Sequence, residues 1–399
     1  MLVLALLLGL PDPLAAAESP ASARARIEIL RRDGEADYNA KRFGDARAKL
    51  TEAYTLGVSA LGPADPLTLS TGVDMAATLG ATGDLVAEEA LERRLAATQL
   101  ATRGERHPDT LTALSNHAAT LWQLDRAAEA EPILRRVWTA RQQTLGEAAD
   151  ATVDTGAALA GVLCDLFRPN EAEPIARRVW AERQVSLGPE AGKTLDAANL
   201  LVGILRQQHR GEDADQLLMR IGAAAVANFS TEDAQTADIA ADIAANVALA
   251  TARLGQPEDG LELLELVYRF QVRSFGEDDR RPLGVLYYRA VLLSQLGRNA
   301  EAEPLAERAA ETLRRQTQAG APPSRLQVVA FNGLGTIRGN QGRWSEGYAA
   351  YRLASVGVQA RYRDRRASGA SDSANQVLVA DRDIFIDQVA SGWQWAHEP

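Results

Sequence analysis

Residues with the chemistry of a binding loop occur at one place in this 399-residue chain. The segment reads Gly188-Pro-Glu-Ala-Gly192-Lys193-Thr194 and has the glycines and the lysine of a phosphate-binding loop. Three residues separate the two glycines where the motif needs four, and the motif also needs a preceding strand. Gly188 and Thr194 recur elsewhere at a fixed spacing without the lysine. We therefore interpret the segment as a connection between helices, and we expect no nucleotide or other cofactor.

The histidines and the single cysteine form no metal-binding or nucleophile motif. No histidine has another at i+3 or i+4, and no HExxH is present, so we expect no metal site. His117 stands at the position of a core leucine, where we expect it to have a hydrogen-bonded partner. Cys164 has no local context for a nucleophile and is expected to be a structural thiol. The chain is therefore predicted to carry no catalytic residue and to be no enzyme.

The composition narrows the classes of partner. Lys and Arg total 43 against 53 Asp and Glu, a net charge of −10, which argues against nucleic-acid binding through a broad basic face. Aromatic residues make up 5% of the chain, so the core must consist mainly of Ala, Leu, Val and Ile. The scarcity of aromatics also opposes a helical carbohydrate-active enzyme, because sugar clefts commonly use stacking aromatic rings.

The sequence contains a repeat of 42 residues, and this repeat determines which helices position any functional site. The columns at that spacing are Thr68, Thr110, Thr152, Thr194 and Thr236, and Gly62, Gly104, Gly146 and Gly188. An insertion of four residues near 236–246 adds about one helical turn, which keeps a buried face in phase.

Each unit is predicted to contain two helices joined by a turn. Apolar residues of one first helix fall at helical spacing, namely Leu111, Leu114, Ala118, Leu121 and Leu124. The second helix ends near Leu145-Gly146, where glycine can take the left-handed C-cap conformation. No segment alternates with a period of two, so we expect no sheet. Such helix pairs bury their apolar faces only against their neighbours, so the units must stack as a solenoid.

These columns resemble the tetratricopeptide repeat. The resemblance is carried by Asn116, Ala118, Leu121 and Leu124 in a first helix and by Ala130 and Pro132 in a second. The period of 42 and the RHPDT stretch at 106–110 are similar to the subclass found in kinesin light chains and many bacterial proteins. The resemblance extends over about residues 24–364 and implies an all-α fold, a right-handed α-solenoid of about eight helix–turn–helix repeats. Asp125, Phe167 and His209 replace the family's turn glycine, so we expect less regular turns in the middle units.

The two ends of the chain carry separate expectations. Residues 1–17 hold an apolar run closed by Ala15-Ala16-Ala17, the small-x-small form of a signal-peptidase site, but no basic residue precedes the run. The run is either the signal peptide of a periplasmic or secreted protein, or the end of a membrane anchor that begins upstream. We assign the repeats to 22–364, a small-polar linker to 365–374, and a C-terminal capping helix with its tail to 375–399.

The resemblance also implies a binding face, since first helices line the concave side of solenoids in this family. Small residues alternate there with amides and charges, and an amide side chain can both donate to and accept from a peptide bond. A solvated face without a dedicated ligand remains the alternative. The candidate partner-binding residues are Asn116, Asn199, Asn246, Asn332, Asp154, Asp196, Asp242, Trp122, Arg206, Arg253 and Arg338.

Two functions are compatible with this organisation. The first is a non-catalytic protein–protein interaction scaffold that binds an extended peptide or a partner helix in its concave groove. The second is a regulatory or sensory repeat module of a larger membrane-anchored signalling protein, for example one joined to a kinase. Both predict a protein or peptide partner and involve neither a nucleic acid nor a small-molecule cofactor, and the N-terminus offers a route to membrane association.

Overall fold

The structure is a computed structural model that describes residues 19–227, 234–321, 324–367, 381, 387, 388 and 390. Helices and their connections make up this described part, which contains no strand, and the all-α prediction is confirmed. The helices are α2 (Pro20–Asn39), α3 (Phe43–Ala60), α4 (Pro66–Ala81), α5 (Leu85–Arg103), α6 (Pro108–Gln123), α7 (Ala127–Leu145), α8 (Asp150–Asp165), α9 (Pro169–Leu187), α10 (Gly192–Gln207), α11 (Gly211–Ala227), α12 (Ala234–Arg253), α13 (Pro257–Phe275), α14 (Arg280–Gln295), α15 (Asn299–Gln318), α16 (Arg325–Asn340) and α17 (Trp344–Ala367).

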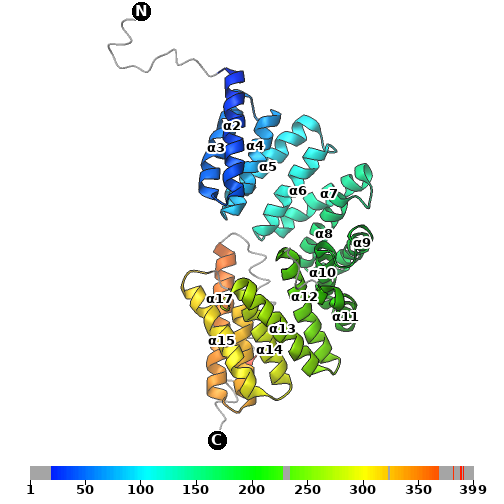
Figure 1. Ribbon diagram of the computed structural model, residues 1–399, viewed down its shortest axis with the longest axis vertical. Coiled ribbons are helices and arrows are strands. Elements are labelled where there is room, and N and C mark those ends of the chain that lie inside the picture. The colour runs from blue at the N-terminus through cyan, green and yellow to red at the C-terminus, as the bar shows by residue number, and fades with distance from the viewer. Residues whose placement is uncertain are drawn as a thin grey trace, which may run out of the picture. The chain divides into compact units, whose positions relative to one another are not determined.

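The chain divides into two compact units, residues 1–162 and 163–399, and the division falls inside α8. Within each unit, consecutive helices pack side by side as hairpins (Figure 1). The first helices of neighbouring hairpins also touch, as α2 does with α4 and α10 with α12. Contacts among the described helices therefore run mainly between near neighbours, which is the pattern of a solenoid.

The predicted helical columns form the core. In the first unit Leu111, Ala118 and Leu121 of α6 are almost completely buried. The start of α6 is set by His107, whose Nδ1 accepts from the N–H of Asp109 at 3.2 Å, and by a proline at the first helical position. Proline suits that position because its missing N–H would have no partner inside the helix.

The turns inside the hairpins are more uniform than the sequence predicts. Asp125, Phe167 and His209 have φ of 59°, 55° and 59°, so they take the positive φ that glycine takes at the other turns. The hydrogen bonds also match: the N–H of Phe167 donates to the carbonyl of Cys164 at 3.0 Å, as the N–H of Asp125 does to its own turn at the same distance. The expectation of less regular turns is wrong. A left-handed residue costs only about 1–2 kcal/mol, which the packing of the paired helices offsets.

The glycines that end the second helices differ from the prediction in detail. Gly146 has φ 90° and ψ 166°, and Gly188 has φ 87° and ψ 164°. These angles lie in an extended region of positive φ that is essentially restricted to glycine, and they do not form a left-handed helical cap. The glycine column therefore sets the direction in which the chain leaves each hairpin.

The threonines that recur every 42 residues, Thr110 and Thr194 among them, stabilise the fold. Thr194 is buried at the start of α10, and its hydroxyl donates to the carbonyl of Arg183 at 3.2 Å. Thr110 makes the same bond to the carbonyl of Gln99 at 3.3 Å. Because a helix, α9, precedes the Gly188–Lys193 segment, its interpretation as an inter-helix connection is confirmed.

The C-terminal part is described at a few residues. Helix α17 continues to Ala367, three residues into the expected linker at 365–374. Asp381 is buried, with its carboxylate 2.5 Å from Arg361 and 3.4 Å from Arg325, so it ties the C-terminal stretch to α16 and α17. Residues 1–17 and most of 375–399 lie outside the described part. Among the described helices, none is long and apolar enough to cross a membrane.

Candidate functional site

The predicted first-helix face is best developed in the second unit, on α10, α12 and α14. Arg206 on α10 donates to the side-chain carbonyl of Asn246 on α12 at 3.0 Å. The amide nitrogen of Asn246 in turn donates to the backbone carbonyl of Asp242 at 3.0 Å. The structure thus brings three of the predicted residues together, and it shows that the Asn246 amide is already held by two partners of its own chain.

Two guanidinium groups share one carboxylate at the end of this face. Arg253 on α12 binds Asp215 on α11 through two hydrogen bonds of 2.8 and 2.5 Å. Arg206 lies 3.9 Å from the same carboxylate. Asp215 is bound mainly by Arg253, so Arg206 makes only a longer contact with this carboxylate.

A cavity of about 530 Å³ lies beside these arginines. Arg206, Asp215, Arg253 and Leu254 are among the residues that line it, and the Leu254 side chain is 61% exposed. Glu212 also lines the cavity, which therefore holds two guanidinium groups, two carboxylates and an accessible apolar side chain.

Charged groups on this face are open to solvent yet surrounded by protein. Desolvation raises the pKa of the Asp196 and Asp242 carboxyls, and the charge of Asp238 raises that of Asp242 further. Desolvation also lowers the pKa of the Arg206 guanidinium, with a second contribution from the charge of Arg253. Asp196, Asp242 and Arg206 are nevertheless exposed.

Two predicted residues of the second unit do not join this face. Arg338 lies mostly buried and binds Glu303 and Glu307, each at 2.9 Å. Asn332 donates to Asp387 at 3.1 Å. The cause is register: α14 begins at Arg280 and α16 at Arg325, 45 residues later, so three residues are added to the 42-residue period.

In the first unit the candidate residues lie on α6 and α8. Asn116 is half-buried and Asp154 is exposed. The indole ring of Trp122 covers Gly161 so closely that a Cβ at this glycine would collide with it. Gly203 in the second unit has open space at the same position of its helix. The space above Gly203 is therefore open, whereas Gly161 is covered by Trp122. Asn199 lies half-buried on α10.

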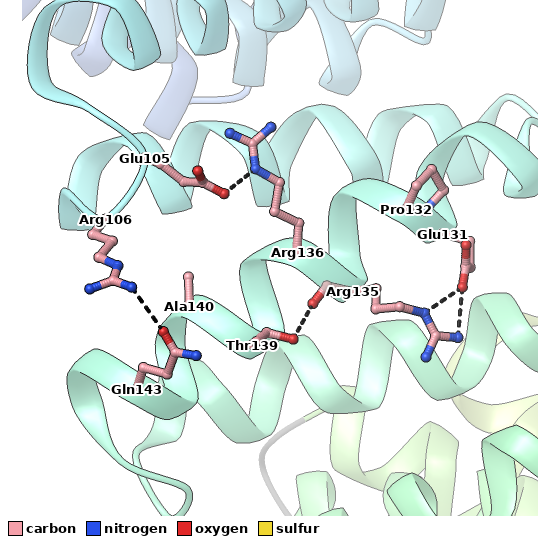
Figure 2. Close-up of a pocket in the computed structure, with 9 residues that line it drawn as sticks. All are labelled: Glu105, Arg106, Glu131, Pro132, Arg135, Arg136, Thr139, Ala140 and Gln143. Carbon is pink, nitrogen blue, oxygen red and sulfur yellow. Dashed lines mark hydrogen bonds and ion pairs between the residues drawn. The ribbon is translucent and has the colours of Figure 1, made fainter.

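A second cavity, of about 460 Å³, lies beside α7 in the first unit (Figure 2). Arg136 pairs with Glu105 there, and Arg135 binds Glu131 at 2.7 Å. Arg308 and Glu277 form a pair with the same separation of 31 residues in the second unit. Because the arrangement recurs, we assign it to the connection between repeats.

The described histidine and cysteine side chains that the sequence singled out lie in structural surroundings. His117 Nε2 lies 3.0 Å from Glu89 Oε1, so the expected partner of this histidine is present. Burial raises the pKa of the Cys164 thiol to about 11, which leaves it inert at neutral pH. Within the described residues, no group of three or more His, Cys, Asp or Glu could hold a metal ion.

A buried group of carboxylates on α5 was not predicted from the sequence. Glu88, Glu89 and Glu92 are 8%, 6% and 7% exposed. The 42-residue spacing could have predicted their burial, because Glu88 and Glu92 stand 42 residues before Ala130 and Leu134, which are core residues.

Comparisons with known proteins agree with this architecture. The family model described as tetratricopeptide repeat matches residues 110–150. A tetratricopeptide repeat protein from Parabacteroides merdae ATCC 43184 is similar in structure, with 12% identity, a TM-score of 0.51, and coverage of 78% of this chain and 99% of the other. The putative kinesin light chain from Podosopora anserina, with nearly identical TPR-like repeats, has 20% identity, a TM-score of 0.46, and coverage of 54% and 100%.

BtubC (BKLC) from P. vanneervenii has 16% identity, a TM-score of 0.42, and coverage of 54% of this chain and 92% of the other. No curated protein matches the chain significantly. The match at 110–150 is similar to one tetratricopeptide repeat, and the repeating helix pairs give the chain an all-α solenoid fold.

Proposed function

We propose that the chain is a non-catalytic scaffold that binds an extended peptide or a helix of a partner protein on the first-helix face of α10, α12 and α14. Tetratricopeptide-repeat folds typically serve protein–protein interaction, and this face is where the chain offers accessible polar groups in a partly desolvated setting. The observation that carries the proposal is Arg206. It is exposed, it shares its carboxylate with Arg253, and it borders a cavity of about 530 Å³.

The charges favour a partner segment with an acidic group beside the arginines. A carboxylate of the partner placed near Arg206 would form charge-assisted hydrogen bonds with a guanidinium group that is 3.9 Å from Asp215. At the other end of the same helices, Asp238 is already paired with Arg281 of α14 at 3.2 Å, and the charges of Arg280 and Arg281 also act on Asp242. A basic group of the partner is therefore only weakly favoured there. Leu254 supplies apolar contact between charged groups.

Site-specific photo-crosslinking in the native host tests this proposal. The cross-linker benzoylphenylalanine replaces Leu249, a half-buried residue that lies one turn from Asn246 and Arg253 on the same face of α12. It is expected to give adducts that the change Arg206→Ala abolishes. The matched control carries the same cross-linker at Val185, an 86% exposed residue of the second helix α9. Adducts of equal yield at both positions, or adducts at Leu249 that do not depend on Arg206, would refute the proposal.

A further inference from the structure

Two core positions of α5 hold carboxylates where the other hairpins hold apolar side chains. Glu88 and Glu92 face the packed interior of the first unit. The residues at the corresponding positions, all at most 1% exposed, are Ala46 and Leu50, Ala130 and Leu134, Ala172 and Ala176, and Ala302 and Ala306. The second hairpin therefore buries two carboxylates at positions where the other hairpins bury apolar side chains.

The neighbouring helices accommodate these carboxylates without neutralising them. On α6, the hydroxyl of Thr120 donates to Glu92 at 2.5 Å. On α4, a Cβ at Gly80 would lie 2.8 Å from both carboxyl oxygens of Glu88, so a larger residue there would require the Glu88 carboxylate to move. One buried oxygen of Glu88 has no hydrogen-bond partner within the described residues.

The basic groups that face this cluster gather at its third member, Glu89. His117 of α6 lies 3.0 Å from Glu89, Arg126 at the start of α7 lies 3.7 Å away, and Arg93 on α5 itself lies 3.9 Å away. Glu88 and Glu92 are thus left with a threonine hydroxyl and with each other's charge. Burying an ionised carboxylate without a cation is costly, so these two groups favour the protonated form.

We propose that Glu88 and Glu92 form a proton-dependent lock between the second and third hairpins. In the uncharged form they allow α5 to pack against α4 and α6, and in the ionised form they repel each other and weaken that packing. Desolvation raises the pKa of Glu92 to about 7 and also raises that of Glu88, which places the change near neutral pH.

The lock is connected to the candidate binding face through α6. Thr120, which faces the carboxylates, belongs to the same helix as Asn116 and Trp122. Loosening α6 would therefore alter the positions of the candidate residues Asn116 and Trp122. The proposal does not depend on any partner of the second unit, because the lock acts within residues 1–162.

The direction of the pH effect follows from proton linkage. A carboxyl whose folded-state pKa lies above its unfolded-state value stabilises the fold at low pH, and this contribution is lost as the pH rises through the folded-state pKa. For Glu92 alone, a change from 4.5 to about 7 raises the opening equilibrium constant about 30-fold between pH 5.5 and pH 8.5.

Amide hydrogen exchange of the whole chain, corrected for intrinsic exchange rates, measures this constant in α5 and α6. The wild type should show an increase in opening of at least about 30-fold between pH 5.5 and pH 8.5. The double variant Glu88→Ala, Glu92→Leu, which installs the residues of the next hairpin, should show less than about threefold. The control Glu52→Ala removes a half-exposed carboxylate of α3 in the same unit and should keep the wild-type increase.

The variant Glu92→Gln provides a test if the double variant does not fold. Glutamine keeps the shape and the acceptor for Thr120 but cannot ionise, so it should remove most of the increase. A flat profile in the wild type, or an unchanged increase in both Glu92 variants, would overturn the proposal.

Discussion

Replacing glycine by alanine should have opposite effects at two neighbouring positions of the second unit. Gly188 ends α9 with φ 87° and ψ 164°, and Gly203 lies in the interior of α10. A Cβ added at either position meets no heavy atom within 4 Å. The difference between the two substitutions is therefore a property of the backbone conformation alone.

The expected magnitudes follow from those conformations. Holding alanine in the extended positive-φ region costs about 1–3 kcal/mol, and the reduced entropy of the unfolded chain returns about 0.4–1 kcal/mol. Taking the middle of each range, the substitution Gly188→Ala should thus lower the free energy of unfolding by about 1.3 kcal/mol. In the helix interior alanine is favoured over glycine, so Gly203→Ala should raise it by about 0.5–1 kcal/mol.

Urea denaturation followed by circular dichroism measures both variants against the wild type. The two midpoints should move in opposite directions with an unchanged dependence on urea. A stabilising or neutral effect of Gly188→Ala would show that the end of α9 does not have this conformation, and a loss at Gly203 would show that α10 is not a helix there.

Three further outcomes are expected. Leu121→Ala, in the core of the first unit, should lower the free energy of unfolding by about 2–5 kcal/mol, and a loss below about 0.5 kcal/mol would show that the register of α6 is wrong. Cys164 should react with iodoacetamide at pH 8 about 100-fold more slowly in the folded protein than in urea. The reason is that burial raises the pKa of its thiol from 9.0 to about 11, and the rate follows the fraction of thiolate. Equal rates in the two conditions would contradict the burial of Cys164. We also predict export with cleavage between Ala17 and Glu18, which N-terminal sequencing of the protein from its host tests; an intact Met1 in a cytoplasmic fraction would refute it.

The repeat columns predicted the helices because their spacing reflects burial. The faces at Leu111 and Leu121, the buried threonines and the partner of His117 all follow from positions that recur every 42 residues. Predictions from the 42-residue spacing were wrong where the period changes. The three added residues before α16 place Asn332 and Arg338 one position away from the expected row, where they bind Asp387 and the glutamates of α15.

Features that depend on exceptions to the repeat were also missed. The sequence shows glutamates at 88 and 92, but charged residues on a helix usually face solvent, so their burial emerged only from the packing of α5 against α4 and α6. The pairing of Arg253 with Asp215 likewise depends on how closely α11 approaches α12. At Phe167 the sequence predicted an irregular turn, but packing imposes the positive φ of glycine on a residue that does not favour it.

The most direct test of the proposed binding face is the affinity of the cross-linked partner peptide, synthesised and measured by calorimetry. Arg206→Ala should weaken binding at least about tenfold without a shift in the melting temperature, with a larger effect at low salt, where charges are screened least. The matched control is Arg269→Ala, which removes an exposed arginine from the second helix α13 and should change affinity less than about twofold. An equal loss in both variants, or no loss in Arg206→Ala, would contradict binding on the face of α10, α12 and α14.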